Sequence, residues 1–454
     1  MRLSRFYFYR TQLRLSLPIM LGQISTILIS ISDTLMVGKY NSIDLAGVAF
    51  ANSLFYSAFV LGIGICFALK PLVANADAAK NQTLVQIFLR NSVSLGILLG
   101  VLSCLALLLL TLFAPYMGQE EVVLKAALPY LQVIALSMIP LFMFAVLKEF
   151  SEALRLPKIG MTVNILGSIF NILLNYLLIF GNYGFPEMGL MGAAWATFIS
   201  RVLMLLIMVV VFFLNKNLFP YAANLFRPLF DGEIIRKIIN LGFPIGIQLF
   251  SETTAFSVAG ILVGMISKEA MAAHQIVLNV ASATFLTALG LAQGTTVNVA
   301  NLMGKKQARF VSQMGNSALF LALGFMSVTA ALLLIFRHEI PWLFLNENDV
   351  LAPQIALIAS HLFIAAGFFQ LSDGAQVVSA GNLRGLEDTK IPTYITLFAY
   401  WGVAIPVGYL MAFGLDWGAM GIWIGLSLGL TIAAILLLLR FWRLTRQINL
   451  KEAE

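Results

Sequence analysis

The sequence predicts an all-α polytopic membrane protein with 12 transmembrane helices, arranged as two pseudo-symmetric six-helix lobes around a central cavity. Hydrophobic residues make up 60% of the 454 residues and charged residues 11%, whereas a soluble domain normally carries about 25% charged residues. Apolar runs of about 20 residues, enough to cross a hydrocarbon core, recur along the chain. Residues of the first half also recur in the second half at a nearly constant offset.

Twelve apolar runs are the predicted membrane spans. Leu, Ala, Met and Gly dominate them and short loops join them, which favours helices over the alternating strands of about 10 residues expected of a membrane β-barrel. The first run is too long for a signal peptide and lacks a small-residue cleavage site, so we expect it to remain as the first helix. The runs are approximately residues 13–37, 46–69, 91–115, 126–147, 159–180, 189–214, 241–266, 271–298, 313–336, 352–380, 392–414 and 419–439.

The basic residues gather in alternate loops. With both termini in the cytoplasm, most Lys and Arg residues fall inside, and Lys39, Lys125, Lys268 and Arg337 fall outside. Cytoplasmic loops of membrane proteins carry this excess of positive charge. We therefore expect a multi-pass protein of the bacterial inner (cytoplasmic) membrane with cytoplasmic N- and C-termini. This topology explains the net charge of +7 without a nucleic-acid partner.

An internal repeat divides the chain. Pro18 of the first half recurs as Pro244, and the same offset relates several further pairs of identical residues. Later in each half a small insertion lengthens the offset, as between Leu154-Arg155 and Leu383-Arg384. Six helices per repeat is an even number, so both halves enter the membrane in the same direction, as in transporters with parallel repeats. We predict an N-lobe at residues 1–214, a cytoplasmic linker at 215–237 and a C-lobe at 238–454.

Three acidic residues, Asp33, Glu252 and Asp373, fall within the predicted helices, and among the basic residues Arg201 alone lies deep in one. A charge at the bilayer centre costs at least about 2.5–3.5 kcal/mol, so such residues face a cavity or a partner and are functional candidates. The alternative is a structural salt bridge to Arg201, but one Arg cannot neutralise three carboxylates on different helices. The repeat assigns them non-acidic counterparts, so the repeated architecture does not require these acids.

Polar residues within the predicted spans are further candidates for the same site. Some share a helix face because they are four residues apart. Hydrogen bonding between helices is the alternative explanation for each of them. These residues are Asn171, Asn175, Thr197, Gln275 and Asn279.

Several motifs resemble those of the multidrug and toxic compound extrusion (MATE) transporters, and the similarity covers essentially the whole chain. Pro244-Ile-Gly-Ile-Gln-Leu-Phe-Ser-Glu252 followed by Ala272-Ala-His-Gln275 resembles their seventh and eighth helices. Gln370-Leu-Ser-Asp373-Gly-Ala-Gln376 resembles their tenth helix, and Ser32-Asp33-Thr34 their first. The pairing of Glu252 with Asp373 is similar to that of the NorM branch of the family.

The resemblance implies a function and assigns roles to residues. Glu252 and Asp373 would bind the coupling cation, Na⁺ or H⁺, or a cationic drug. Asp33, Asn171, Asn175 and Thr197 would form a site in the N-lobe. The implied activity is secondary active efflux of cationic or zwitterionic amphiphilic drugs by alternating access, with no cofactor besides the coupling ion.

Other functions fit the sequence less well. A flippase for lipid-linked saccharides would line its cavity with several Arg and Lys residues, whereas the deep charges of this chain are mainly acidic. Intramembrane enzymes and ATP-driven pumps would show catalytic or nucleotide-binding motifs, which are absent from the sequence. A selective channel usually needs rings of equivalent charged groups. Two lobes in one chain form a complete pathway, so we expect a monomer in the lipid bilayer.

Overall fold

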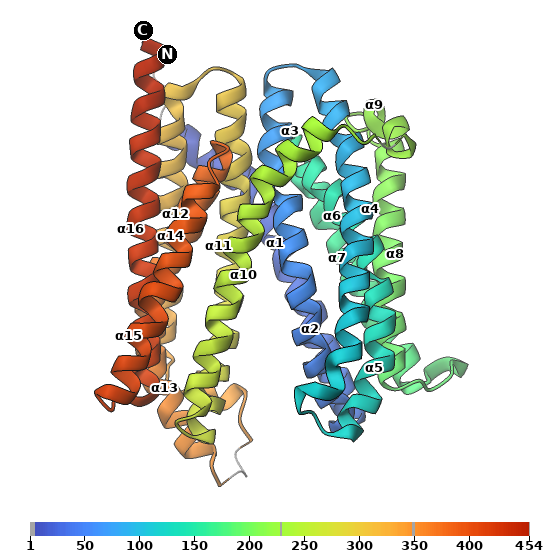
Figure 1. Cartoon of the computed structure of the whole chain (residues 1–454), viewed down its shortest axis with the longest axis vertical. Coiled ribbons are helices and arrows are strands. Elements are labelled where there is room, and N and C mark those ends of the chain that lie inside the picture. The colour runs from blue at the N-terminus through green and yellow to red at the C-terminus, as the bar shows by residue number, and fades with distance from the viewer. Residues whose placement is uncertain (1–4, 228, 347–349, 454) are drawn as a thin grey trace. The chain divides into compact units, whose positions relative to one another are not determined.

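The computed structural model describes residues 5–227, 229–346 and 350–453, which are almost entirely helical and contain no strand. Figure 1 shows long helices joined by short connections. The helices of the first half are α1 (Arg5–Tyr40), α2 (Ser42–Phe67), α3 (Leu69–Ala78), α4 (Gln82–Phe113), α5 (Glu121–Leu136), α6 (Met138–Ala153), α7 (Pro157–Phe180), α8 (Leu190–Leu214) and α9 (Phe219–Ala222). The second half contains α10 (Gly232–Gly264), α11 (Lys268–Gly304), α12 (Val311–Ile335), α13 (Ala352–Gly385), α14 (Lys390–Leu397), α15 (Ile405–Tyr409) and α16 (Gly418–Ala453).

Each of the twelve predicted spans coincides with one of these helices or with a run of consecutive ones. Ten helical segments within the described residues are long and apolar enough to cross a membrane, and the bent pair α5–α6 makes an eleventh. Helix α1 covers the first predicted span. The eleventh predicted span contains two π-helical segments, Phe398–Ala404 and Leu410–Gly414, on either side of α15. The predicted all-α membrane fold is therefore confirmed.

The chain forms two compact units. The C-terminal unit contains the described residues up to Met20 and those from Ile247 onward, and the N-terminal unit contains Leu21–Gly246. Helices α1 and α10 thus each contribute to both units. The division into lobes at 1–214 and 238–454 remains a prediction about the repeat.

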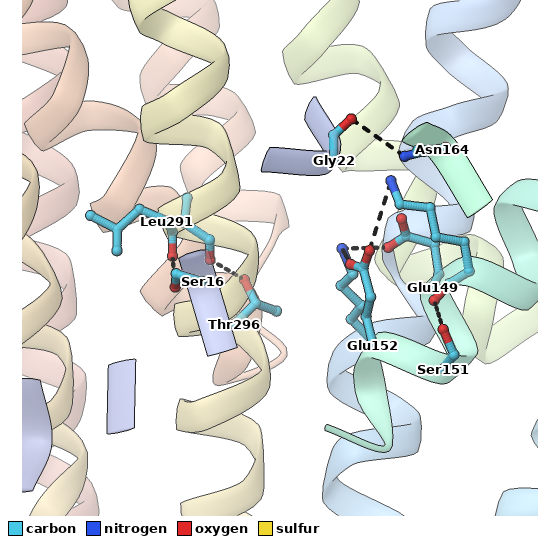
Figure 2. A network of polar contacts seen from close by, with 11 residues as sticks. Ser16, Gly22, Glu149, Ser151, Glu152, Asn164, Leu291 and Thr296 are labelled. Atoms are coloured by element: carbon cyan, nitrogen blue, oxygen red, sulfur yellow. Dashed lines mark hydrogen bonds and ion pairs between the residues drawn. The ribbon is translucent and has the colours of Figure 1, made fainter. Parts of the chain in front are cut away.

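The C-terminal unit is built around α13, which packs against α11, α12 and α16. One of its apolar clusters includes Phe363, Tyr400 and Trp423, all fully buried. The beginning of α1 joins this unit through polar contacts as well as apolar ones. Gln12 donates hydrogen bonds to Thr295 (2.6 Å) and accepts one from Asn298 (2.8 Å), and Ser16 donates to the carbonyl of Leu291 (3.3 Å; Figure 2).

The N-terminal unit contains a buried network of charges between α3 and α6. The ammonium group of Lys70 lies 2.8 Å from Glu149 and 2.7 Å from Glu152, and all three residues are at most 1% exposed. Figure 2 shows the two carboxylates directed toward the same point. The expectation that Asp33, Glu252 and Asp373 are the acids within the helices is therefore incomplete. Helix α6 continues past the apolar run that predicted it and carries Glu149 and Glu152 into the packed interior.

The two units share backbone features at equivalent positions of the repeat. Lys80 and Lys306, which the repeat aligns, have φ values of 60° and 56° where α3 and α11 end. Gly189 and Gly418, another aligned pair, have φ values of 53° and 57° where α8 and α16 begin: Gly189 directly precedes α8, and Gly418 is the first residue of α16. Left-handed backbone conformations are common at helix ends, and most readily adopted by Gly. Their recurrence at aligned positions shows that both units have the same local architecture.

The charged network has no equivalent in the other unit, although the backbone there is equivalent. The repeat maps Lys70 to Thr296 and Glu152 to Gly381. Thr296 donates a hydrogen bond to the Gly381 carbonyl oxygen (2.8 Å), and a Cβ atom on Gly381 would lie 2.6 Å from the Ala292 carbonyl oxygen. At the positions where the N-terminal unit has an ionic network, the C-terminal unit therefore has closely packed helices.

Replacing Lys70 by Met tests how far the network stabilises the protein. The substitution leaves two buried carboxylates without their bridging ammonium group, which we expect to cost about 3–5 kcal/mol. Thermal unfolding of the detergent-solubilised protein, followed by Trp fluorescence, measures this loss. The matched control is Lys125→Met, which removes an exposed ion pair to Glu121 of 2.7 Å and should cost less than about 1 kcal/mol. Equal shifts in the two variants would contradict a stabilising network.

Candidate functional site

An acidic pair lies inside the C-terminal unit. Glu252 is on α10 and Asp373 in the middle of α13, and their exposed fractions are 7% and 2%. The two carboxyl groups are close enough to interact electrostatically. Like charges repel strongly in an environment that excludes water, so a proton or a bound cation would stabilise this pair. The structure thus brings together the two C-lobe acids that the sequence analysis selected.

Aromatic residues lie next to the acidic pair. Tyr400, which is fully buried in a π-helical segment, interacts electrostatically with both carboxyl groups. The ring of Phe256 lies 6.2 Å from that of Tyr400 and 5.9 Å from that of Phe369, centroid to centroid. π-Helical segments often occur at functional sites because they shift side chains out of the regular helical register. Sequence analysis missed Tyr400, which lies in an apolar run without a distinguishing pattern.

A buried arginine also belongs to this region. Arg384, in the last turn of α13, donates a hydrogen bond from Nη2 to Oε1 of Gln248 (3.2 Å) and interacts electrostatically with Glu252. Gln248 lies one helical turn before Glu252 on α10. The expectation that Arg201 was the one deep basic residue is therefore wrong, since Arg384 and Lys70 are also buried. Both lie at the ends of apolar runs, where hydropathy does not distinguish a packed residue from a solvated one.

A second polar cluster lies inside the N-terminal unit. Asn175, on α7, donates a hydrogen bond to the carboxylate of Asp33 on α1 and another to Oδ1 of Asn171 (3.3 Å). Asn171 in turn donates to the hydroxyl of Thr197 on α8 (3.4 Å). These are the four residues that the sequence analysis grouped in the N-lobe, and they form one continuous chain of contacts. Three helices therefore contribute to a single cluster around the Asp33 carboxylate.

Gln275 and Asn279 have a different setting from the other candidates. They lie one turn apart on α11, and Nε2 of Gln275 donates to Oδ1 of Asn279 (3.3 Å). Both side chains are exposed. The structure therefore pairs these two residues with each other, on an exposed face of the C-terminal unit.

Comparison with known proteins identifies the family. The MatE family model matches the chain twice, at residues 18–177 and 244–410, and the two matches begin at Pro18 and Pro244, the prolines that the repeat aligns. The chain belongs to the MatE family.

Relatives of this MatE protein are named as multidrug resistance proteins. A probable multidrug resistance protein NorM of Rhizobium meliloti is 33% identical over 97% of this chain and 94% of its own length. The multidrug resistance protein PmpM of Pseudomonas aeruginosa is 35% identical over 96% of this chain and 91% of its own length. The similarity to the NorM branch that the acidic pair indicated is therefore confirmed.

Solved structures of MATE transporters share the fold. An outward-facing multidrug resistance MATE family transporter of the MOP superfamily superposes with a TM-score of 0.89 at 19% identity, covering 97% of both chains. The eukaryotic MATE transporter AtDTX14 gives 0.87 at 18% identity, covering 98% of this chain and 99% of that chain. At these identities the likeness shows the fold of the MatE protein alone, and says nothing about its substrate.

The exposed pair on α11 can be tested by chemical labelling. Amide side chains are costly against lipid, so we expect both positions to face water. In a background with Cys66→Ala and Cys104→Ala, Gln275→Cys and Asn279→Cys should react with a membrane-impermeant maleimide in proteoliposomes. Val277→Cys, at a fully buried position of the same helix, is the matched control and should react at least about tenfold more slowly. Labelling of Gln275→Cys and Asn279→Cys as slow as that of Val277→Cys would place them away from water.

Proposed function

We propose that this MatE protein is a secondary active multidrug antiporter. It exports cationic or zwitterionic amphiphilic drugs across the bacterial inner membrane in exchange for Na⁺ or H⁺, by alternating access. The observation that carries the proposal is the buried pair of Glu252 and Asp373. Two carboxylates in one water-poor site favour a single visiting cation, so drug and coupling ion compete for the same place.

The surroundings of the acidic pair suit both a small coupling cation and an organic cation. Carboxylate oxygens, together with the hydroxyl of Tyr400, are the hard oxygen ligands that small metal cations prefer. The rings of Phe256, Phe369 and Tyr400 offer apolar area and cation–π attraction to an organic cation. Competition between the two visitors couples the downhill movement of one to the uphill movement of the other.

The charge balance does not favour a flippase for anionic lipid-linked substrates. Such a substrate needs several unpaired cations. In the described part of the chain, Lys70 lies between two carboxylates, Arg384 interacts with Glu252 and Arg201 interacts with Asp33. The deep basic residues are therefore associated with acids.

Neutral isosteres at the acidic pair test the proposal. Glu252→Gln and Asp373→Asn remove the charge and retain the shape, so each should lower drug efflux from cells at least about tenfold while the protein still inserts in the membrane. The matched controls Glu121→Gln and Asp416→Asn make the same chemical changes at exposed positions and should leave efflux within about twofold. Full transport by both site variants would contradict the proposed role of the pair.

The energy source is tested in proteoliposomes. Purified protein is reconstituted with a fluorescent organic cation, and a sodium or a proton gradient is imposed separately. We expect at least one gradient to drive accumulation of the dye against its own gradient, and Glu252→Gln to abolish that response. Transport that is independent of both gradients and requires ATP would refute secondary antiport.

A further inference from the structure

Arg201 is a permanent cation inside the N-terminal unit. It lies on α8, one helical turn after Thr197, and interacts electrostatically with Asp33. Its guanidinium carbon lies 4.8 Å from the ring centroid of Phe55 on α2. Nη1 donates a hydrogen bond to the hydroxyl of Ser137, at the 41° bend between α5 and α6.

We call the surroundings of this guanidinium the cation slot: Phe55 and Ser137 contact it directly, and Asp33 and Tyr130 act on it electrostatically. Tyr130, on α5, is buried and also interacts electrostatically with the guanidinium. A carboxylate, an aromatic face and hydroxyl groups are the groups that bind an organic cation in a partly dehydrated site. In this unit the occupant of the slot is a side chain of the protein itself.

The repeat shows that the fold does not require this arrangement. It maps Asp33 to Ala259, Phe55 to Ala281, Ser137 to Ala366 and Arg201 to Leu430. All four counterparts are buried in one apolar cluster of the C-terminal unit. Well-packed apolar residues often replace opposite charges inside a protein without loss of stability. The charged version is thus an addition to a scaffold that packs well without it.

We propose that Arg201 is a tethered competitor, which occupies the cation slot of the N-terminal unit and whose charge must move away from Asp33 before a transported organic cation can bind there. This inference rests on the proposed export of cations and adds a residue that sets affinity in the N-terminal unit. A guanidinium beside Asp33 repels a second positive charge and weakens its binding. Such a competitor favours export, because the return of Arg201 to the cation slot displaces the transported cation and then prevents it from binding again.

A purely structural role for Arg201 makes the opposite prediction. If the residue served only to hold the bend at Ser137, its replacement would loosen the unit and weaken cation binding. Arg201→Gln separates the two roles, because the amide can still donate a hydrogen bond to Ser137 while the charge is lost.

The experiment is equilibrium dialysis of radiolabelled tetraphenylphosphonium against the purified full-length protein in detergent. Arg201→Gln should bind at least about tenfold more tightly, a change of about 1.4 kcal/mol. Adding Asp33→Asn to it should abolish the gain, because the freed carboxylate is its source. Arg201→Lys retains a tethered cation and should stay within about threefold of the wild type.

The matched control is Arg309→Met. Arg309 also stacks on a phenylalanine, with its guanidinium carbon 4.7 Å from the ring centroid of Phe310, but that pair lies in the C-terminal unit, outside both polar clusters. Its removal should leave the affinity unchanged, which separates a local effect of Arg201 from a general loss of positive charge.

The possible results separate this inference from the proposed function. Wild-type binding with unchanged or weaker binding by Arg201→Gln overturns the role of Arg201 alone. Failure of every variant to bind the cation overturns both. If Arg201→Gln aggregates on size exclusion, Asp33→Asn alone decides. A change in affinity below about twofold supports a carboxylate whose charge Arg201 already offsets, and a larger loss overturns the inference.

Discussion

Burying charge in a membrane protein is expensive, and most of the polar architecture of this chain follows from that cost. Lys70 holds Glu149 and Glu152 between α3 and α6. Arg384 hydrogen-bonds Gln248 and interacts with Glu252. Asp373 differs from these, because the charged group that interacts with it is another carboxylate. A site with surplus negative charge is the place where a mobile cation is most strongly attracted.

The internal repeat explains how one scaffold carries two different polar sites. Equivalent helix ends keep the same left-handed backbone, as Lys80 and Lys306 show, so both units fold by the same local rules. Their polar groups nevertheless occupy non-equivalent positions. Glu252 maps to Thr26 and Arg201 to Leu430, and the repeat therefore supplies packing while each unit has acquired its own chemistry.

Sequence reasoning selected the N-terminal polar cluster well and the surroundings of the acidic pair less well. Asp33, Asn171, Asn175 and Thr197 are polar residues in strongly apolar runs, which makes them conspicuous, and the structure joins them through hydrogen bonds. Tyr400 gave no such signal, since aromatic residues are common in membrane helices. Glu149, Glu152 and Arg384 lie just beyond the predicted apolar runs, so hydropathy gives no sign that they are buried.

The sequence by itself determined the all-helical membrane fold, the repeat and three of the acids inside the helices, because each depends on composition and spacing along the chain. Only the tertiary structure decided which charges share a site. The approach of Lys70 to Glu149 and Glu152, of Arg384 to Gln248 and of Arg201 to Phe55 depends on how separate helices pack. Packing is set by many side-chain contacts at once, and the linear order of residues does not record which helix faces meet.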